Sequence, residues 1–290
     1  MGIDIHAFNF IRMQAIKNGL ASTLTIGRQS LSVTSEFISN QLNTEMGKGD
    51  GYCELLLKKF NATDVAPIDF SDYEKPTYVG DLNLPIDIPK QFDTVIDSGS
   101  LEHVFDPVAA FKNLIKFCKV GGQIIHILPV NNLGGHGFWQ FSSDLMFSIY
   151  STENGFSDTE VYYASGLDFS TWYKVPGAKA GHRVQLVSLE PIVLLCVSKK
   201  VELVDTIRAV QPFYVNAWAA HDVDALENSK SVSKIWVFAK WLQRQHVPLG
   251  NLLRNTVLIL GLAFGRSQYS IKHPRFKREV VKDLFKGERK

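Results

Sequence analysis

One run of sequence constrains the fold more than any other: the segment from Phe92 to Asp97, which leads into Ser98, Gly99 and Ser100. Phe92, Val95 and Ile96 supply its apolar character, and it ends on an acid followed by a glycine-containing loop. A strand of this kind is typical of a parallel sheet covered by helices, and such sheets bind ligands beyond the carboxyl ends of their strands. We therefore predict an α/β protein whose ligand site lies at the end of this strand.

Helical and strand-like segments alternate along the chain around this run. Apolar spacing and capping signals predict helices over 4–19, 35–42, 54–60, 106–119 and 143–150. β-rich runs predict strands over 23–26, 65–70, 76–80, 92–97, 123–128, 159–163, 184–189 and 192–198. We expect Gly121-Gly122 to end the fourth helix, and Pro67 to mark an edge position or an irregular strand start. The alternation predicts a mostly parallel sheet with helices on both faces.

The composition is that of a globular chain with a distinct C-terminal part. Its 290 residues, 45% of them hydrophobic and 21% charged, suffice for one large domain and an appendage. We divide the chain into an N-terminal helix over 1–22, a main domain over 23–200 and a helical extension with a basic tail over 201–290. The net charge of +2 argues against nucleic acid as a partner, because phosphate binding favours a strongly basic surface.

Cysteine usage and hydropathy bear on the compartment. Cys53, Cys118 and Cys196 are scattered, which is typical of reduced thiols in a cytoplasmic protein, and no signal peptide is apparent. The apolar run 257–264 is much shorter than the roughly 20 residues that span a bilayer, so we expect a buried helix there. The basic residues from Lys272 onward leave open a weak contact with a membrane surface, and a homodimer is also left open.

Three successive predicted strands end close to an acid. Asp69 is placed to accept the hydroxyls of a ribose, and Asp81 to accept an exocyclic amine, with Leu82 packing against the base. Asp97 ends the central strand, where Gly99 permits close approach of a ligand to the backbone. A single acid at a strand end more often caps a turn or helix, but three in succession favour a ligand site.

Two motifs carry a resemblance to a known family. The first is Phe92-Asp-Thr-Val-Ile-Asp97-Ser-Gly-Ser-Leu-Glu102-His103-Val-Phe-Asp106-Pro107, followed by Gly121-Gly122. The second is the Asn-Asn-x-x-Gly-His-Gly-Phe loop that runs from Asn131 to Phe138. With them, the segment from Thr23 to Lys200 resembles class I S-adenosylmethionine-dependent methyltransferases, and in particular a bacterial group with that loop.

The resemblance implies a Rossmann-like methyltransferase fold with a mostly parallel seven-stranded sheet. It implies S-adenosyl-L-methionine as cofactor and methylation of an oxygen on a small-molecule or glycan-type acceptor. The residues that it assigns to the cofactor are Gly27, Arg28, Gln29, Asp69, Asp81, Leu82, Asp97, Ser98 and Gly99.

The loop after the first strand departs from the family pattern. The family has Gly-x-Gly-x-Gly there, whereas this chain has the single glycine of Gly27-Arg28-Gln29. Arg28 suits a cofactor carboxylate, because a guanidinium pairs well with that group. Alternatively, Arg28 and Gln29 fill the pocket and leave a catalytically silent binding or scaffold protein. A dinucleotide-binding enzyme is less favoured, because no Gly-x-Gly-x-x-Gly opens a helix.

Acceptor binding and catalysis are predicted in the loops after two strands. We take His136 as the candidate general base or acceptor-binding residue, with a loop-organising histidine as the alternative. Residues expected on the acceptor are His103, Asn132, His136, Phe138 and Trp139. A metal site built from Glu102, His103 and a neighbouring Asp has too few ligands in view, so we expect no metal. His126 lies inside an apolar strand and is predicted to be a hydrogen-bonded core residue.

Overall fold

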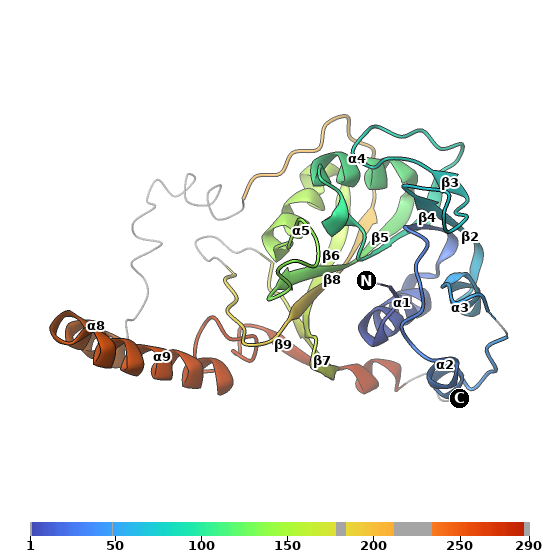
Figure 1. Ribbon diagram of the computed structural model, residues 1–290. Helices are drawn as coiled ribbons and strands as arrows, with labels where there is room; N and C mark the ends of the chain where they lie inside the picture. The colour runs from blue at the N-terminus through green and yellow to red at the C-terminus, as the bar shows by residue number, and fades with distance from the viewer. Residues whose placement is uncertain (1, 48, 178–183, 212–233, 287–290) are drawn as a thin grey trace.

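The computed structural model describes residues 2–47, 49–177, 184–211 and 234–286, and one nine-stranded sheet dominates it (Figure 1). The strand order is β3-β2-β1-β4-β5-β8-β6-β7-β9. The strands are β1 (Ala21–Ile26), β2 (Ala62–Asp69), β3 (Tyr78–Val79), β4 (Phe92–Ser98), β5 (Cys118–Asn131), β6 (Phe156–Ser165), β7 (Asp168–Lys174), β8 (Ile192–Lys200) and β9 (Lys277–Val280). The first five of these in sheet order pair in parallel, and the other four join by antiparallel pairing.

The order of the sheet confirms the predicted Rossmann-like methyltransferase fold. Strands β3, β2, β1, β4 and β5 repeat the doubly wound order, and the antiparallel β8 is inserted between β5 and β6. The sheet has nine strands where seven were expected, because β7 and β9 extend it beyond β6. All the parallel strands therefore end at one edge, which is where such a sheet holds its ligand.

Helices cover both faces of the sheet. One face carries α1 (Ile5–Asn18), α2 (Ser35–Leu42) and α3 (Glu54–Lys59), and the other carries α4 (Pro107–Phe117) and α5 (Ser143–Ile149) (Figure 1). Successive residues of β4 face opposite sides. Val95 belongs to the core under α4, and Ile96 belongs to the core under α1. Both are completely buried, as expected for a strand covered by helices on both faces.

The helix α4 shows where local sequence signals are accurate and where they are not. Asp106 accepts a hydrogen bond from the Ala109 backbone N–H at 3.0 Å, so the predicted start of the helix is confirmed. Its predicted end at Gly121-Gly122 is wrong, because β5 already begins at Cys118. A Cβ on Gly122 would lie 2.6 Å from the Asp93 carbonyl oxygen. That glycine therefore allows β5 to pass close to β4.

One further strand prediction is wrong, and one strand was missed. The predicted strand over 184–189 is irregular, while β7, whose first half is polar, was not predicted. Pro67 lies inside β2 opposite Thr25, where β3 does not reach, so its outer side is edge-like as predicted.

The C-terminal segment contributes both helices and a strand. The helices α8 (Lys234–Gln245) and α9 (Val247–Ala263) form a hairpin beyond the sheet, whereas β9 pairs with β7 as the outermost strand (Figure 1). The expected burial of the apolar run 257–264 is wrong, since Ile259 and Leu260 are 47% and 50% exposed. Among the described residues, no helix combines the length and apolarity needed to cross a membrane.

Candidate functional site

The loop after β1 is shaped by Gly27. Its φ is +74°, in the left-handed region, and its N–H donates to the Ile68 carbonyl at 2.7 Å. A Cβ at this position would lie 2.8 Å from the Ser100 hydroxyl oxygen. Glycine is therefore required both by the backbone conformation and by the closeness of the loop after β4.

Asp69 ends β2 beside that loop. Its Oδ2 accepts the backbone N–H of Arg28 at 3.1 Å, and its Oδ1 accepts that of Phe70 at 2.7 Å. The carboxylate thus joins the ends of β1 and β2, and a carboxylate has further lone pairs for a ligand hydroxyl. The next side chain, Phe70, is 72% exposed and was not predicted as a site residue. An open aromatic ring next to this acid offers a stacking surface for a planar group.

The third acid, Asp81, organises its own loop. Its Oδ1 accepts the backbone N–H of Asn83 at 2.9 Å and the Asn83 side-chain amide at 2.7 Å. The Leu82 carbonyl in turn accepts the Asn113 amide at 3.3 Å, which ties the loop to α4. Leu82 itself packs partly buried against the core. These contacts fix the position of the Asp81 carboxylate near the edge of the sheet.

Arg28 is bound by groups of the protein itself. Its Nε pairs with Glu54 at 2.7 Å, its Nη2 pairs with Asp50 at 2.5 Å, and its Nη1 donates to the Glu74 carbonyl at 2.7 Å. The guanidinium also stacks over Tyr52, with its carbon 4.0 Å from the ring centroid. Although partial burial opposes it, pairing with these two carboxylates raises the pKa of Arg28 above its ordinary value. These contacts account for the side chain without a cofactor carboxylate.

Gln29 lies between the ends of β1 and β4. Its side-chain amide donates to the Ile26 carbonyl and, at 3.0 Å, to the Ser100 hydroxyl, and the residue is buried. Ser100 also donates to the Ile26 carbonyl at 2.7 Å. Gln29 therefore bridges two neighbouring strand ends.

Asp97 at the end of β4 is used inside the protein. Its Oδ2 lies 2.9 Å from His126 Nδ1, and His126 Nε2 lies 2.5 Å from the Tyr150 hydroxyl. Its Oδ1 accepts the backbone N–H of Ser100 at 3.0 Å. Asp97, His126 and Tyr150 are all buried, and burial raises the pKa of Tyr150 well above its ordinary value. The prediction that His126 is a hydrogen-bonded core histidine is confirmed.

The two residues after Asp97 shape the strand end. The Ser98 hydroxyl is buried and donates to the Gly2 carbonyl at 3.1 Å, which holds the N-terminal segment against β4. Gly99 has a φ of +86°, so it supplies the left-handed turn that leads out of the strand. Neither Ser98 nor Asp97 presents its side chain at the surface.

Glu102 lies in the short 3-10 helix Leu101–His103 that follows β4. It is completely buried, and neither carboxylate oxygen has a hydrogen-bond partner in the described part of the chain. Burial, together with the nearby Asp97 carboxylate, raises the pKa of Glu102 to about 7. The sequence motif contains this acid, but nothing in its local pattern indicates that it is buried without a partner.

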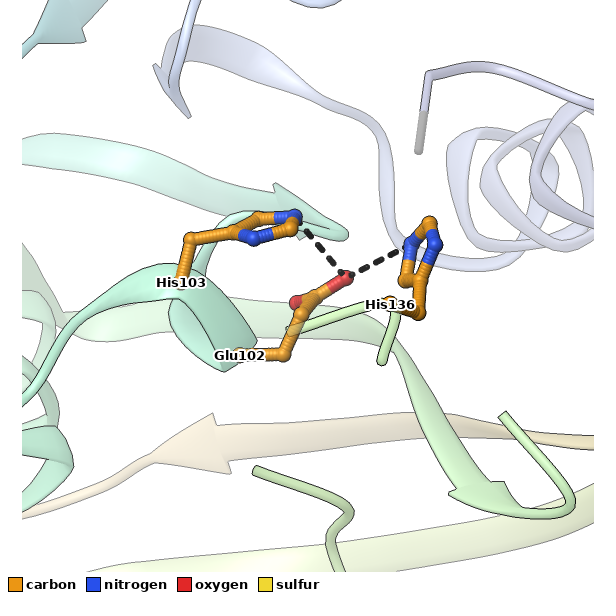
Figure 2. A group of neighbouring side chains, drawn as sticks. All are labelled: Glu102, His103 and His136. Carbon is orange, nitrogen blue, oxygen red and sulfur yellow. Dashed lines mark ion pairs between the residues drawn. The ribbon is translucent and has the colours of Figure 1, made fainter. Parts of the chain in front are cut away.

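Two imidazoles approach Glu102 from opposite sides (Figure 2). His103 Nε2 lies 3.8 Å and His136 Nε2 lies 3.6 Å from Glu102 Oε1. The rings are 5.5 Å apart between centroids. Partial burial lowers the pKa of His103, and the neighbouring His136 lowers it further. The structure thus brings together two of the predicted acceptor residues around an acid that the prediction had left aside.

The loop that carries His136 is fastened to the same segment. The Trp139 indole N–H donates to the Val104 carbonyl at 2.9 Å, so Trp139 holds this loop against the segment after β4. Phe138 is 68% exposed and meets Phe105 edge to face at 6.1 Å. Phe105 is also exposed and was not predicted. These rings border the cluster of Glu102 and the two histidines with an open aromatic surface.

Asn132 has a structural role in the same loop. Its side-chain amide donates to the Ser188 carbonyl at 2.8 Å and to the Glu190 carbonyl at 3.1 Å. The two bonds fasten the loop after β5 to the segment before β8. They employ both of the amide hydrogens that were expected to meet an acceptor.

Comparisons with known proteins give structural neighbours only. No family model matches the chain, and no curated protein matches it. A SAM-dependent methyltransferase from Thermotoga maritima has 18% identity and a TM-score of 0.33, over 68% of this chain and 91% of that one. A SAM-dependent methyltransferase from Clostridium acetobutylicum has 12% identity and a TM-score of 0.33, over 66% and 90% of the two chains.

The N-methyltransferase NodS from Bradyrhizobium japonicum, in complex with S-adenosyl-L-homocysteine, has 12% identity and a TM-score of 0.38, over 69% of this chain and 91% of its own. At such identities and TM-scores these likenesses carry no argument about activity. The fold assignment therefore rests on the strand order.

Proposed function

We propose that this protein is an S-adenosylmethionine-dependent methyltransferase. The observation that carries the proposal is the strand order β3-β2-β1-β4-β5-β8-β6 with Gly27 and Asp69 at the ends of the two strands where this fold binds adenosine. Asp69 would accept the ribose hydroxyls, and the exposed Phe70 ring would stack on the adenine. Asp81 is fixed on the same edge, where it would accept the exocyclic amine.

The residues fit the two halves of the cofactor differently. The adenosine half would meet Gly27, the Asp69 carboxylate and the open Phe70 ring, whereas the methionine half would pass the buried Gln29 side chain between β1 and β4. S-adenosylmethionine supplies an already activated methyl group when bound. The work of the protein is then to orient the acceptor and exclude water.

For the acceptor, we propose an oxygen of a small molecule or glycan. Glu102, His103 and His136 gather a carboxylate and two imidazoles, which are groups that take a proton from a hydroxyl near neutral pH. The exposed rings of Phe105 and Phe138 border them and suit the apolar face of a sugar or ring. His136 thus keeps its proposed role as base, now as a member of a cluster.

A second candidate, a catalytically silent binding or scaffold protein, is favoured by one observation. The Gln29 amide bonds to the Ile26 carbonyl and the Ser100 hydroxyl, and so stands between β1 and β4, where the methionine half would lie. Under this alternative the same fold would bind no cofactor.

Titration calorimetry with S-adenosylmethionine and S-adenosylhomocysteine separates the two candidates. The methyltransferase proposal expects both ligands to bind with one-to-one stoichiometry and to raise the melting temperature. No heat of binding and no thermal stabilisation by either ligand would favour the silent protein.

A further inference from the structure

We propose that Glu102, His103 and His136 form a binding site for a divalent transition-metal ion. One donor atom from each of the three residues lies within 4.8 Å of the others. Both imidazoles point toward the Glu102 carboxylate, one from the segment after β4 and the other from the loop after β5 (Figure 2).

The unsatisfied carboxylate is the first independent reason. Both oxygens of the completely buried Glu102 lack a hydrogen-bond partner among the described residues. An isolated buried carboxylate is costly unless a positive charge or hydrogen bonds compensate it. The imidazole nitrogens of His136 and His103 lie 3.6 and 3.8 Å from Glu102 Oε1, which is too far for a hydrogen bond. A bound cation would satisfy the carboxylate directly.

The distances suit such an ion. With metal–ligand distances near 2.1 Å, neighbouring donors around a tetrahedral Zn²⁺ lie about 3.4 Å apart. The separations of 3.6 and 3.8 Å between the imidazole nitrogens and Glu102 Oε1 are close to that value. Side-chain rotations would close the set, because the two histidine side chains are 48% and 36% exposed.

The donor types narrow the choice of ion. Two imidazoles and one carboxylate are typical ligands of Zn²⁺, Fe²⁺ and Mn²⁺, whereas Mg²⁺ and Ca²⁺ prefer sets made of oxygen alone. Three protein ligands leave at least one coordination position open. The partly exposed histidines lie on the solvent side of the buried Glu102, so the ion has a route in.

The backbone holds the donors together before any ion binds. The Glu102 carbonyl accepts the N–H of Phe138 at 2.7 Å and that of Trp139 at 3.2 Å, immediately after His136. The loop after β5 is thereby fixed over the acid, as the ligand-bearing segments of a metal site need to be.

Phe105 and Phe138, whose exposed rings lie edge to face, each follow one of the two histidines by two residues. If the proposed methyl transfer holds, an acceptor oxygen bound at the open coordination position would be polarised and would lose its proton more readily. With the ion bound, His136 would act as a ligand in place of the base. This consequence rests on the proposed function, whereas the metal site does not.

The test is calorimetric titration of the chelator-treated 290-residue protein with ZnCl₂ and, separately, MnCl₂. The wild type is expected to bind one equivalent of at least one ion. Glu102→Gln and His136→Asn are expected to bind about 10-fold more weakly or worse. His246→Asn is the matched control, because His246 caps α9 far from the cluster and asparagine also caps.

Co²⁺ titration followed by visible absorption gives a second readout of coordination number and ligand type, and it is expected to change in His103→Asn. Circular dichroism confirms that each variant is folded. The proposal would be overturned if the wild type bound neither ion, or if Glu102→Gln and His136→Asn bound it as tightly as the wild type does. Calorimetry with S-adenosylhomocysteine on the metal-free protein tests the methyltransferase function separately.

Discussion

The carbonyl oxygen of Glu102 accepts the backbone N–H of Phe138 at 2.7 Å, although the two residues lie on loops that follow different strands. This bond fixes the loop after β5 over the segment after β4. It places His136 within 3.6 Å of the Glu102 carboxylate. The chemistry of the site therefore depends on how closely these two loops approach.

Gly137 makes that approach sterically feasible, so Gly137→Ala should disrupt it. The added Cβ would lie 2.7 Å from the Glu102 carbonyl oxygen and 2.9 Å from its Cγ. We expect a loss of about 1–3 kcal/mol in the free energy of unfolding, measured with urea. Gly134→Ala in the same loop is the control, since its Cβ would meet nothing within 4 Å. Equal effects of the two substitutions would refute the role given to Gly137.

Glu102→Gln should change how the stability of the metal-free protein depends on pH. The pKa of Glu102 is about 7 in the folded protein against an ordinary 4.5, so the folded state holds this proton more tightly than the unfolded state does. Wild-type stability relative to Glu102→Gln should therefore fall by up to about 3 kcal/mol as pH rises from 4.5 to 7, and level off above that.

Glu160→Gln provides a control of opposite sign for this experiment. Burial opposes the shift, but hydrogen bonding and pairing with Lys174 lower the pKa of Glu160. The stability that Glu160 contributes is therefore lost as pH falls toward its pKa. Denaturant unfolding of the three proteins from below pH 4.5, where the Glu160 trend lies, to above pH 7 measures both trends. Parallel curves for wild type and Glu102→Gln would contradict the assignment.

Asp97→Ala should act on folding. The carboxylate accepts backbone N–H groups and pairs with the buried His126, so its removal leaves these groups unpaired. We expect a cost of about 3–5 kcal/mol in unfolding free energy. Tyr150→Phe removes the hydroxyl that is hydrogen-bonded to His126 on the side away from Asp97. It should cost about 1–3 kcal/mol in unfolding free energy. A fully stable Asp97→Ala protein would show that Asp97 has another role.

Gln29→Ala should strengthen the binding of S-adenosylhomocysteine. The buried side chain stands between the ends of β1 and β4, and its removal would leave space there for the methionine half of the ligand. We expect about a 10-fold gain in affinity, which corresponds to about 1.4 kcal/mol. Gln91→Ala serves as the control, because the Gln91 amide bonds to the Lys116 carbonyl instead. A weaker affinity of Gln29→Ala would show that the amide contacts the ligand.

The parallel part of the fold could be predicted from sequence, because its signals are local. The apolar run of β4 and the Asp106 cap of α4 depend on neighbouring residues alone. The strands β7 and β9 could not be predicted in this way. They are short or partly polar and are stabilised by pairing between segments about a hundred residues apart, such as Thr171 with Val280.

The candidate site divides in the same way. Gly27 and Asp69 lie where their strand ends predict, whereas the internal bonds of Arg28 and Asn132 depend on partners distant in the chain. The closeness of His136 to Glu102 depends on two loops meeting, which no spacing in either motif encodes. We expected no metal because too few ligands stood together in the sequence. In the proposed site the third donor, His136, comes from a different loop than Glu102 and His103.

The most direct measurement compares S-adenosylhomocysteine binding by Asp69→Ala and Asp64→Ala. Asp69 ends β2 beside Gly27, whereas Asp64, earlier in the same strand, pairs with Lys90 at the surface. We predict binding by the wild type and by Asp64→Ala, with affinity at least about 10-fold lower for Asp69→Ala, since a ribose hydroxyl would lose a charged partner. Equal affinities of the two variants, or no binding by the wild type, would contradict a cofactor site at the end of β2.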